Sequence, residues 1–489
     1  MNKYTSRNHI FLIFLLPLAF ISCGKPVSIR EAILTDKNNF YYIDFKEYPS
    51  GDSSLPIGIF DSGTGGLSTL DDIIDHEGLR GESFTFLGDL ANMPYGSYAL
   101  ENNTPLLIEH IMKDIQFLLG EKYYHSAGSR DYLNDKSPVK AIVIACNTAT
   151  AYGLDTIRNF LQDAGLDIGV IGVIDAGAQG AFGNFSPDEN GSIAVMATDG
   201  TVRSGAYPAT ITYVKNKEGL TGTVPVFQQA GIGIAEAIDE KSEFIDRTAR
   251  KPRQGYKGPT EKGTGEMRID TALWERYHFD MLNGAMLFEG DAANPFNLQI
   301  NSVENYISFH LVTLMEKIRA TDGVQPLNSL VLACTHYPFF TETFRTTLAR
   351  LRDYRENGEY IYRPLIAEDL IIVNPASVVA GQLYQHLLEK ELLNSSENIT
   401  GEFYVTIPNI DNKNVSLSKD GSLTYDYKYG RRAGEIQEYV KCVPFSRSVL
   451  PEDMLLRLAD QVPGVYDLIM KFNRENIKML YLADDERIK

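Results

Sequence analysis

Two of the four cysteines in this chain follow the same kind of sequence. The stretches IVIACNT (142–148) and LVLACTH (330–336) each place an apolar run before Ala-Cys, with polar residues next. Cys146 and Cys334 therefore occupy equivalent positions at the ends of two expected buried strands. This repetition suggests an internal duplication that places one thiol on each side of a central cleft. Buried cysteines without a chemical role are also common, and that interpretation stays open at this point.

Three kinds of chemistry are compatible with these thiols. A nucleophilic cysteine needs a histidine base, and His336 lies two residues after Cys334, although closeness in sequence does not establish contact. A metal site would need a tighter Cys/His cluster, and neither stretch has a CxxC spacing. Two opposed thiols could instead remove an α-proton on one face and donate one on the other, which inverts a carbon without a cofactor. His336 and Asp61 are natural proton partners for them.

The surrounding elements predict how the thiols are positioned. Short apolar runs predict strands within 56–60, 83–89, 141–145, 192–201 and 329–338. Amphipathic stretches predict helices beginning at 67 and spanning 104–119, 147–161 and 301–318. Strands that alternate with helices imply parallel, doubly wound sheets, whose ligands bind at the carboxyl ends of the strands. We therefore expect an α/β fold with two similar doubly wound domains that face a central cleft, plus a small C-terminal appendage.

The domain boundaries follow from changes in composition. We expect the first α/β region at 55–185 and the second at 186–390, interrupted by an insertion at about 240–300. Within the insertion, residues 251–266 are basic and rich in Gly and Pro, which indicates a solvated, mobile loop or a lid. The C-terminal extension covers 391–489.

The extension has weaker local signals. Residues 402–409 and 422–430 indicate a β-hairpin, and 451–470 a helix. Cys442 lies in this part of the chain without a partner motif, and we interpret it as structural or as a free thiol.

The N-terminus has the pattern of an export signal. Lys3 and Arg7 precede the apolar run 10–21, which is too short to span a membrane, and Cys23 follows the small residue Ser22. This arrangement resembles the lipobox of bacterial lipoproteins. It implies a signal peptide at 1–22, acylation of Cys23, a tether at 23–54 and a lipid-anchored, extracytoplasmic location in the cell envelope. An ordinary signal peptide or a short anchor is the alternative.

Composition limits the class of partner. The chain has 489 residues, with 46 Lys+Arg against 64 Asp+Glu and a formal net charge of −18. Binding to nucleic acid is disfavoured, because phosphate contacts need clustered basic residues. Four cysteines in so long a chain cannot form a disulfide scaffold.

Six motifs occur in the order typical of one protein family. They are IGIFDSGTGGLSTL (57–70), FLGDLANMPYGSY (86–98), IACNTATA (144–151), IGVIDAGAQGA (171–181), ATDGTVRSGAY (197–207) and LACTHYPFF (332–340). Over most of 56–386 the chain resembles the aspartate/glutamate racemase family, and most closely its glutamate racemases.

The resemblance implies cofactor-independent racemisation by Cys146 and Cys334, with Asp61 and His336 as auxiliary acid/base residues. It implies no cofactor and no metal, a small amino-acid substrate, and it allows a homodimer. The residues expected to hold the substrate are Ser62, Tyr95, Gly96, Asn147, Thr148, Thr198, Thr201 and Thr335. Ser62, Thr148 and Thr201 have an alternative role as helix N-caps.

One departure from the family affects specificity. The family commonly carries an acidic residue after the TxGT motif, where this chain has Gln228, Gln229 and Ala230. Either Glu236 replaces that residue or it is missing, which leaves strict glutamate specificity open. Two other functions remain: a lipid-anchored amino-acid-binding protein on a racemase fold, or a related cofactor-free enzyme such as a hydantoin racemase.

Overall fold

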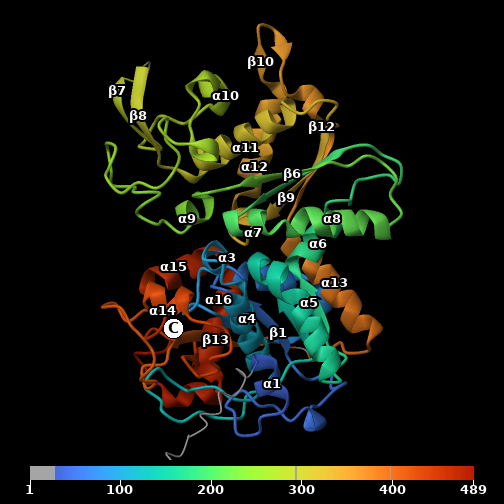
Figure 1. The fold of residues 1–489 in the computed structure, drawn as a ribbon, viewed down its shortest axis with the longest axis vertical. Helices are drawn as coiled ribbons and strands as arrows, with labels where there is room; N and C mark the ends of the chain where they lie inside the picture. Colours follow the sequence, from blue (N-terminus) through green and yellow to red (C-terminus); the bar gives the residue numbers. More distant parts are fainter. Residues whose placement is uncertain (1–27, 292–293, 397) are drawn as a thin grey trace, which may run out of the picture.

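The structure is a computed structural model that describes residues 28–291, 294–396 and 398–489. Figure 1 shows two α/β units stacked along the long axis, with the second unit above the first. The predicted signal peptide, 1–22, and Cys23 lie outside the described residues. No helix within the described residues has the length and apolar composition needed to cross a membrane.

The first unit is built on a six-stranded sheet. Its order is β14-β13-β2-β1-β3-β4, and only β14 runs antiparallel to its neighbour. The strands are β1 Ile57–Asp61, β2 Ser83–Gly88, β3 Ala141–Ile144, β4 Gly169–Gly172, β13 Thr400–Pro408 and β14 Val440–Pro444. Every residue of β1 and β3 is buried, as the continuous apolar runs predict.

The second unit is built on a four-stranded parallel sheet. Its order is β12-β9-β5-β6, so β9, which leads to Cys334, lies inside the sheet. The strands are β5 Ser192–Ala197, β6 Val226–Ala230, β9 Leu327–Ala333 and β12 Ile366–Val373. Ile193 and Val195 pack on one face of this sheet, and Ala194 and Met196 pack on the other.

Helices cover both faces of both sheets, which confirms the doubly wound prediction. The first sheet packs against α2, α13 and α16 on one face and against α1, α4 and α5 on the other. The second packs against α9, α11 and α12 on one face and against α6 and α8 on the other. The helices of these layers are α1 Ile29–Leu34, α2 Leu67–Asp75, α4 Thr104–Leu119, α5 Asn147–Asp163, α6 Val173–Gly180, α8 Ala206–Lys217, α9 Ile234–Ile238, α11 Val303–Arg319, α12 Thr341–Asp353, α13 Pro375–Glu389 and α16 Pro463–Glu475.

The C-terminal extension is part of the first unit. Strand β13 pairs in parallel with β2 along Thr400–Val405, and β14 pairs with β13. The hairpin expected from 402–409 and 422–430 is wrong in its second strand, because Tyr425–Gly430 forms the short helix α14. The Oγ1 of Thr424 caps this helix by accepting a hydrogen bond from the backbone N–H of Tyr427 at 3.4 Å, which a pattern of alternating tyrosines does not reveal.

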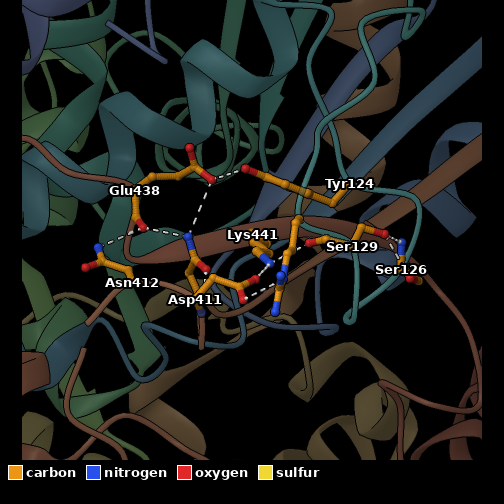
Figure 2. A network of polar contacts seen from close by, with 9 residues as sticks. Tyr124, Ser126, Ser129, Asp411, Asn412, Glu438 and Lys441 are labelled. Carbon is orange, nitrogen blue, oxygen red and sulfur yellow. Dashed lines mark hydrogen bonds and ion pairs between the residues drawn. The ribbon is translucent and has the colours of Figure 1, made fainter. Parts of the chain in front are cut away.

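Polar contacts also join the extension to the loop after α4. Figure 2 shows Tyr124 donating a hydrogen bond to Glu438, close to the start of β14. The Lys441 ammonium is buried, donates to the carbonyl of Ser129 at 2.6 Å and pairs with Asp411 at 2.6 Å. A buried ammonium is costly without such partners, so these contacts fix the register of the extension against the loop.

Residues 28–54, expected as part of a tether, pack against the first unit. Helix α1 lies against α4, and Ile33 and Tyr41 are buried in the core around α4 and α5. Ser28 caps α1 through a hydrogen bond from the backbone N–H of Glu31 at 3.1 Å. The apolar positions of this segment are therefore core contacts, which the mixed polar and aromatic sequence did not indicate.

The insertion at 240–300 forms a packed layer on α11. It contains α10 Trp274–Tyr277 and the hairpin of β7 Met286–Asp291 with β8 Asn294–Ile300. Ile269, Tyr277 and Leu298 are buried in the core shared with α11. Within the stretch expected as a mobile loop, the Tyr256 hydroxyl accepts a hydrogen bond from the backbone N–H of Ile300 at 3.0 Å.

The contact between α2 and α16 predicts a pH-dependent stability. Burial, together with the nearby carboxylates of Asp75 and Asp72, raises the pKa of Asp71 on α2 to about 6. An unfolded aspartate titrates near pH ~4, so the folded state holds this proton more tightly, and stability falls as pH rises from about 4 through about 6. Asp71→Asn should therefore raise the melting temperature more at pH 8 than at pH 4.5.

Asp155→Asn, an exposed change on α5, is the matched control and should shift the melting temperature little at either pH. An equal effect of Asp71→Asn at both pH values would contradict the assignment.

Candidate active site

The carboxyl ends of the two sheets meet at one cavity. It has a volume of about 350 Å³, within the size range of small-molecule sites. All of the residues predicted from the sequence to be catalytic or substrate-binding line it, and their individual roles stay predictions. They are Asp61, Ser62, Tyr95, Gly96, Cys146, Asn147, Thr148, Thr198, Thr201, Cys334, Thr335 and His336.

Cys146 comes from the end of β3 and is held as a neutral thiol. It is the N-cap residue of α5, and its Sγ accepts a hydrogen bond from the backbone N–H of Ala149 at 3.4 Å. Burial raises the pKa of Cys146 to about 12, and the neighbouring Asp61 carboxylate adds to the shift. Its Sγ also lies 3.4 Å from the hydroxyl of Ser62. The environment thus favours the protonated form, which can donate.

Cys334 comes from the end of β9 and has a different environment. Its Sγ lies 3.7 Å from Nδ1 of His336, and Nε2 of His336 lies 3.3 Å from Oδ1 of Asp239. Burial acts to lower the pKa of His336, but the hydrogen bonds to Asp239 and Cys334 outweigh burial and hold this pKa well above its ordinary value. Cys334 therefore has a cationic neighbour, His336, whereas Cys146 has an acidic one, Asp61.

Asp61 lies at the end of β1, next to Cys146. Its Oδ2 accepts a hydrogen bond from the backbone N–H of Gly66 at 2.9 Å. Burial raises the pKa of Asp61, while that hydrogen bond and the charge of His336 oppose the rise. Asp61 therefore interacts electrostatically with both halves of the site. Its carboxylate raises the pKa of Cys146, and its own pKa is lowered by the charge of His336, which lies next to Cys334.

Glycines allow the two units to approach closely at this cavity. A Cβ on Gly65 would lie 2.4 Å from Oγ1 of Thr335, and one on Gly200 would lie 3.0 Å from the Cα of Gly96. Ser68 bridges the same interface by donating a hydrogen bond to the carbonyl of Thr335 at 3.0 Å. Gly65 thus leaves room for the Thr335 side chain, and Gly96 and Gly200 permit contact between the two backbones.

The remaining polar residues are already ordered by hydrogen bonds. Thr198 donates to Thr201 at 3.1 Å, and the side-chain oxygen of Asn147 accepts from the Tyr207 hydroxyl at 3.0 Å. This contact uses the oxygen of the Asn147 amide, and the amide nitrogen is a separate donor group.

Tyr95 differs from this group, because its hydroxyl lies 2.6 Å from both Asp89 and Asp114. Burial raises the pKa of Asp114 well above its ordinary value, so a protonated Asp114 can donate to Tyr95 while Tyr95 donates to Asp89. The hydroxyl is therefore occupied, and Tyr95 lines the cavity without a free hydroxyl.

Sequence reasoning missed Asp239. It considered Glu236, which lines the cavity but accepts a hydrogen bond from the backbone N–H of Gly233 at 3.1 Å. Asp239 lies three residues later, on the same side of α9, and is the residue that contacts His336. Gln229 is fully buried and donates to the carbonyl of Ala230 at 3.1 Å, so it does not take the place of the family's acid.

One wall of the cavity was also not predicted from the sequence. Helix α15, Glu452–Gln461, in the C-terminal extension contributes Arg457 and Leu458 to the lining. Nothing in the local sequence of this helix indicates a ligand site, since its placement depends on the pairing of β13 with β2.

Comparison with known proteins gives a consistent result. No family model matches the chain. It is 37% identical over 351 residues to the glutamate racemase of Lactobacillus acidophilus, which covers 72% of this chain and 88% of that protein. It is 36% identical over 198 residues to the glutamate racemase of Lactobacillus helveticus, spanning 40% of this chain and 61% of that protein. The glutamate racemase isoform RacE1 of Bacillus anthracis aligns in structure over 72% of this chain and 89% of that chain, with a TM-score of 0.43 and 23% identity.

The fold and the cavity together define the kind of site that this chain carries. Two facing α/β units each bring one strand-end thiol to a shared cavity, which defines a two-thiol site on an α/β fold. The relatives then define the family, and the chain belongs to the glutamate racemase family.

The contact between Asp239 and His336 makes a prediction that needs no substrate. Asp239→Asn should lower the pKa of His336, because it replaces a carboxylate beside the imidazolium by a neutral amide. NMR titration of the His336 ring protons measures this shift. The matched control is Glu236→Gln, which removes a carboxylate from the same cavity without a contact to His336. An unchanged titration of His336 in Asp239→Asn would contradict the assignment.

Proposed function

We propose that this chain is a cofactor-independent amino-acid racemase that interconverts L- and D-glutamate. The observation that carries the proposal is the unequal surroundings of the two thiols in one cavity, with Cys146 beside the Asp61 carboxylate and Cys334 beside an imidazolium. Relatives of this chain that carry the name glutamate racemase support the choice of substrate.

The mechanism follows from this charge distribution. The Cys334 thiolate removes the α-proton of the substrate, so that the C–H bond breaks, an S–H bond forms and the electron pair stays on the α-carbon. The Cys146 thiol then donates its proton to the opposite face of that carbon. The product has inverted configuration, and the negative charge has moved from Cys334 to Cys146. The reverse reaction, starting from the other enantiomer, restores the original state.

The polar lining has a stabilising part in this scheme. The strand-end hydroxyls of Thr198 and Thr335 and the amide of Asn147 can hold the α-carboxylate without adding a net charge. Asp61 and Asp239 supply negative charge that the substrate ammonium can balance. A pure binding protein would need these polar groups but would not need two thiols of opposite protonation, which is why racemisation is preferred over amino-acid capture.

We also propose that the chain is a lipid-anchored protein of the cell envelope. The proposal is supported by the sequence of residues 1–23, in which two basic residues precede an apolar run and a Ser-Cys pair follows it. In Figure 1, α1 lies at the end of the first unit that is remote from the second unit, so an anchor that precedes α1 would leave the cavity unobstructed. A homodimer stays a prediction from the family resemblance.

The two-thiol mechanism predicts the effect of removing each cysteine. Cys146→Ala and Cys334→Ala should each lower the rate of glutamate racemisation by a factor of about 10² to 10⁴, the usual contribution of one acid or base. Circular dichroism of D- or L-glutamate solutions follows the reaction. Cys442→Ala is the matched control, because this third free cysteine lies on β14 outside the cavity, and it should keep its activity. Wild-type activity in either of the first two variants would contradict the mechanism.

The anchor predicts a covalent lipid on Cys23. In a bacterial host fed labelled palmitate, the full chain should carry label and fractionate with membranes. Cys23→Ser should lose the label and leave the membrane fraction, whereas Cys442→Ala should behave like the full chain. Label retained in Cys23→Ser would rule out this attachment site.

A further inference from the structure

The C-terminal extension supplies one wall of the cavity. Met454, Arg457, Leu458 and Gln461 from α15, together with Val462, line it next to both catalytic cysteines. In Figure 1, α15 lies at the boundary between the two units, close to α3, Gly96–Leu100, and below α9. This part of the chain lies beyond the six motifs on which the family resemblance rests.

The wall is fixed by its own core contacts. Leu455 and Leu458 of α15 are buried in the core of the first unit. The following helix, α16, packs on β13 and α2 through Ile469 and Phe472. Because these side chains belong to the same core as β1 and β3, the helix that carries Arg457 is held in a fixed position relative to Cys146.

Among the described residues that line the cavity, three are basic. They are Lys241, His336 and Arg457. Lys241 is exposed to solvent, and His336 is engaged by Asp239 and Cys334. Arg457 is the one of the three that is carried by a packed helix and is not engaged by Asp239 or Cys334.

The guanidinium of Arg457 has donors to spare. The Arg457 side chain is 23% exposed, and its Nη1 donates to Asp453 Oδ2 at 3.0 Å, one helical turn earlier. Asp453 is 74% exposed, so this ion pair is well solvated and weak. A guanidinium carries five N–H groups in a planar fork that fits a carboxylate, and within the described residues only Nη1 has an acceptor here.

We propose that Arg457 binds the side-chain carboxylate of an acidic substrate and thereby selects acidic over neutral amino acids. This inference rests on the proposed function. Binding of a second substrate carboxylate in this cavity is disfavoured by negative charge unless a cation balances it. The acids that line the cavity are Asp61, Asp199, Glu236 and Asp239. With the α-carboxylate held by strand-end hydroxyls and amides, Arg457 is the group that compensates for the distal one.

An indirect role of Arg457, through Asp239, would change the kinetics in a different way. Its charge also helps to keep the pKa of Asp239 low, behind the larger effects of burial, which opposes the shift, and of His336 and Lys241. If Arg457 acted only through Asp239, its removal would alter the pH profile of kcat and leave KM for glutamate unchanged. Direct binding of the substrate carboxylate predicts a raised KM for glutamate, whatever change in the pH profile accompanies it.

The test compares Arg457→Gln and Arg457→Lys with the wild-type protein. Arg457→Gln should raise KM for glutamate about 10- to 100-fold, the loss expected for a charge-assisted hydrogen bond, with a smaller change in kcat. Arg457→Lys should recover part of the loss. The control is Arg474→Gln, an arginine of α16 that is 72% exposed, paired with Glu475 and outside the cavity, and it should match wild type.

The outcomes separate this inference from the proposed function. If wild type racemises glutamate and Arg457→Gln keeps its KM, or changes only its pH profile, the inference is overturned and the function stands. If wild type does not racemise glutamate, the proposed function fails. The inference is then tested by the rise in melting temperature that glutarate, a dicarboxylate without an amine, causes in each protein. Stabilisation of wild type but not of Arg457→Gln supports it, and equal stabilisation or none in wild type overturns it.

Discussion

The chemistry of this protein depends on the ion pair between Asp239 and His336. Without it, burial would favour a neutral imidazole, and Cys334 would have no positive neighbour. The two cysteines have almost the same exposure, 7% for Cys146 and 6% for Cys334, so solvent access does not make them different. The difference comes from charge: Cys146 lies beside the Asp61 carboxylate, and Cys334 lies beside a histidine that a carboxylate keeps protonated.

Bringing this ion pair and both thiols into one cavity requires both sheets. Asp239 ends a short helix after β6, and His336 follows β9, which are both in the second unit. Cys146 and Asp61 follow strands of the first unit. The close approach of Gly65 to Thr335 and of Gly96 to Gly200 brings the two sets together, and a larger side chain at these positions would separate the sheet ends. The C-terminal extension then closes the side of the cavity next to α2 and α3, which makes it part of the site.

Local patterns in the sequence predicted the strands that carry Asp61, Cys146 and Cys334, because buried parallel strands are continuous apolar runs whose ends are marked by polar residues. The same reasoning placed α4 at 104–119 and α11 close to 301–318. It could not place Asp239, whose role depends on a histidine almost one hundred residues away in the chain. It also treated 28–54 and 391–489 as peripheral, because their burial depends on pairing and packing with residues far away in sequence. The second half of the expected C-terminal hairpin failed for a local reason, since a Thr424 cap favours α14 over a strand.

The central claim is that the two thiols share one cavity but have neighbours of opposite charge, an acid beside Cys146 and an imidazolium beside Cys334. The most direct measurement is the rate at which iodoacetamide alkylates each cysteine near neutral pH in the substrate-free protein, read by mass spectrometry of the Cys146 and Cys334 peptides. The thiolate is the reactive form, and the two side chains are about equally exposed, so the rates report protonation. The account predicts that Cys334 is alkylated well before Cys146. Equal rates, or faster alkylation of Cys146, would contradict it.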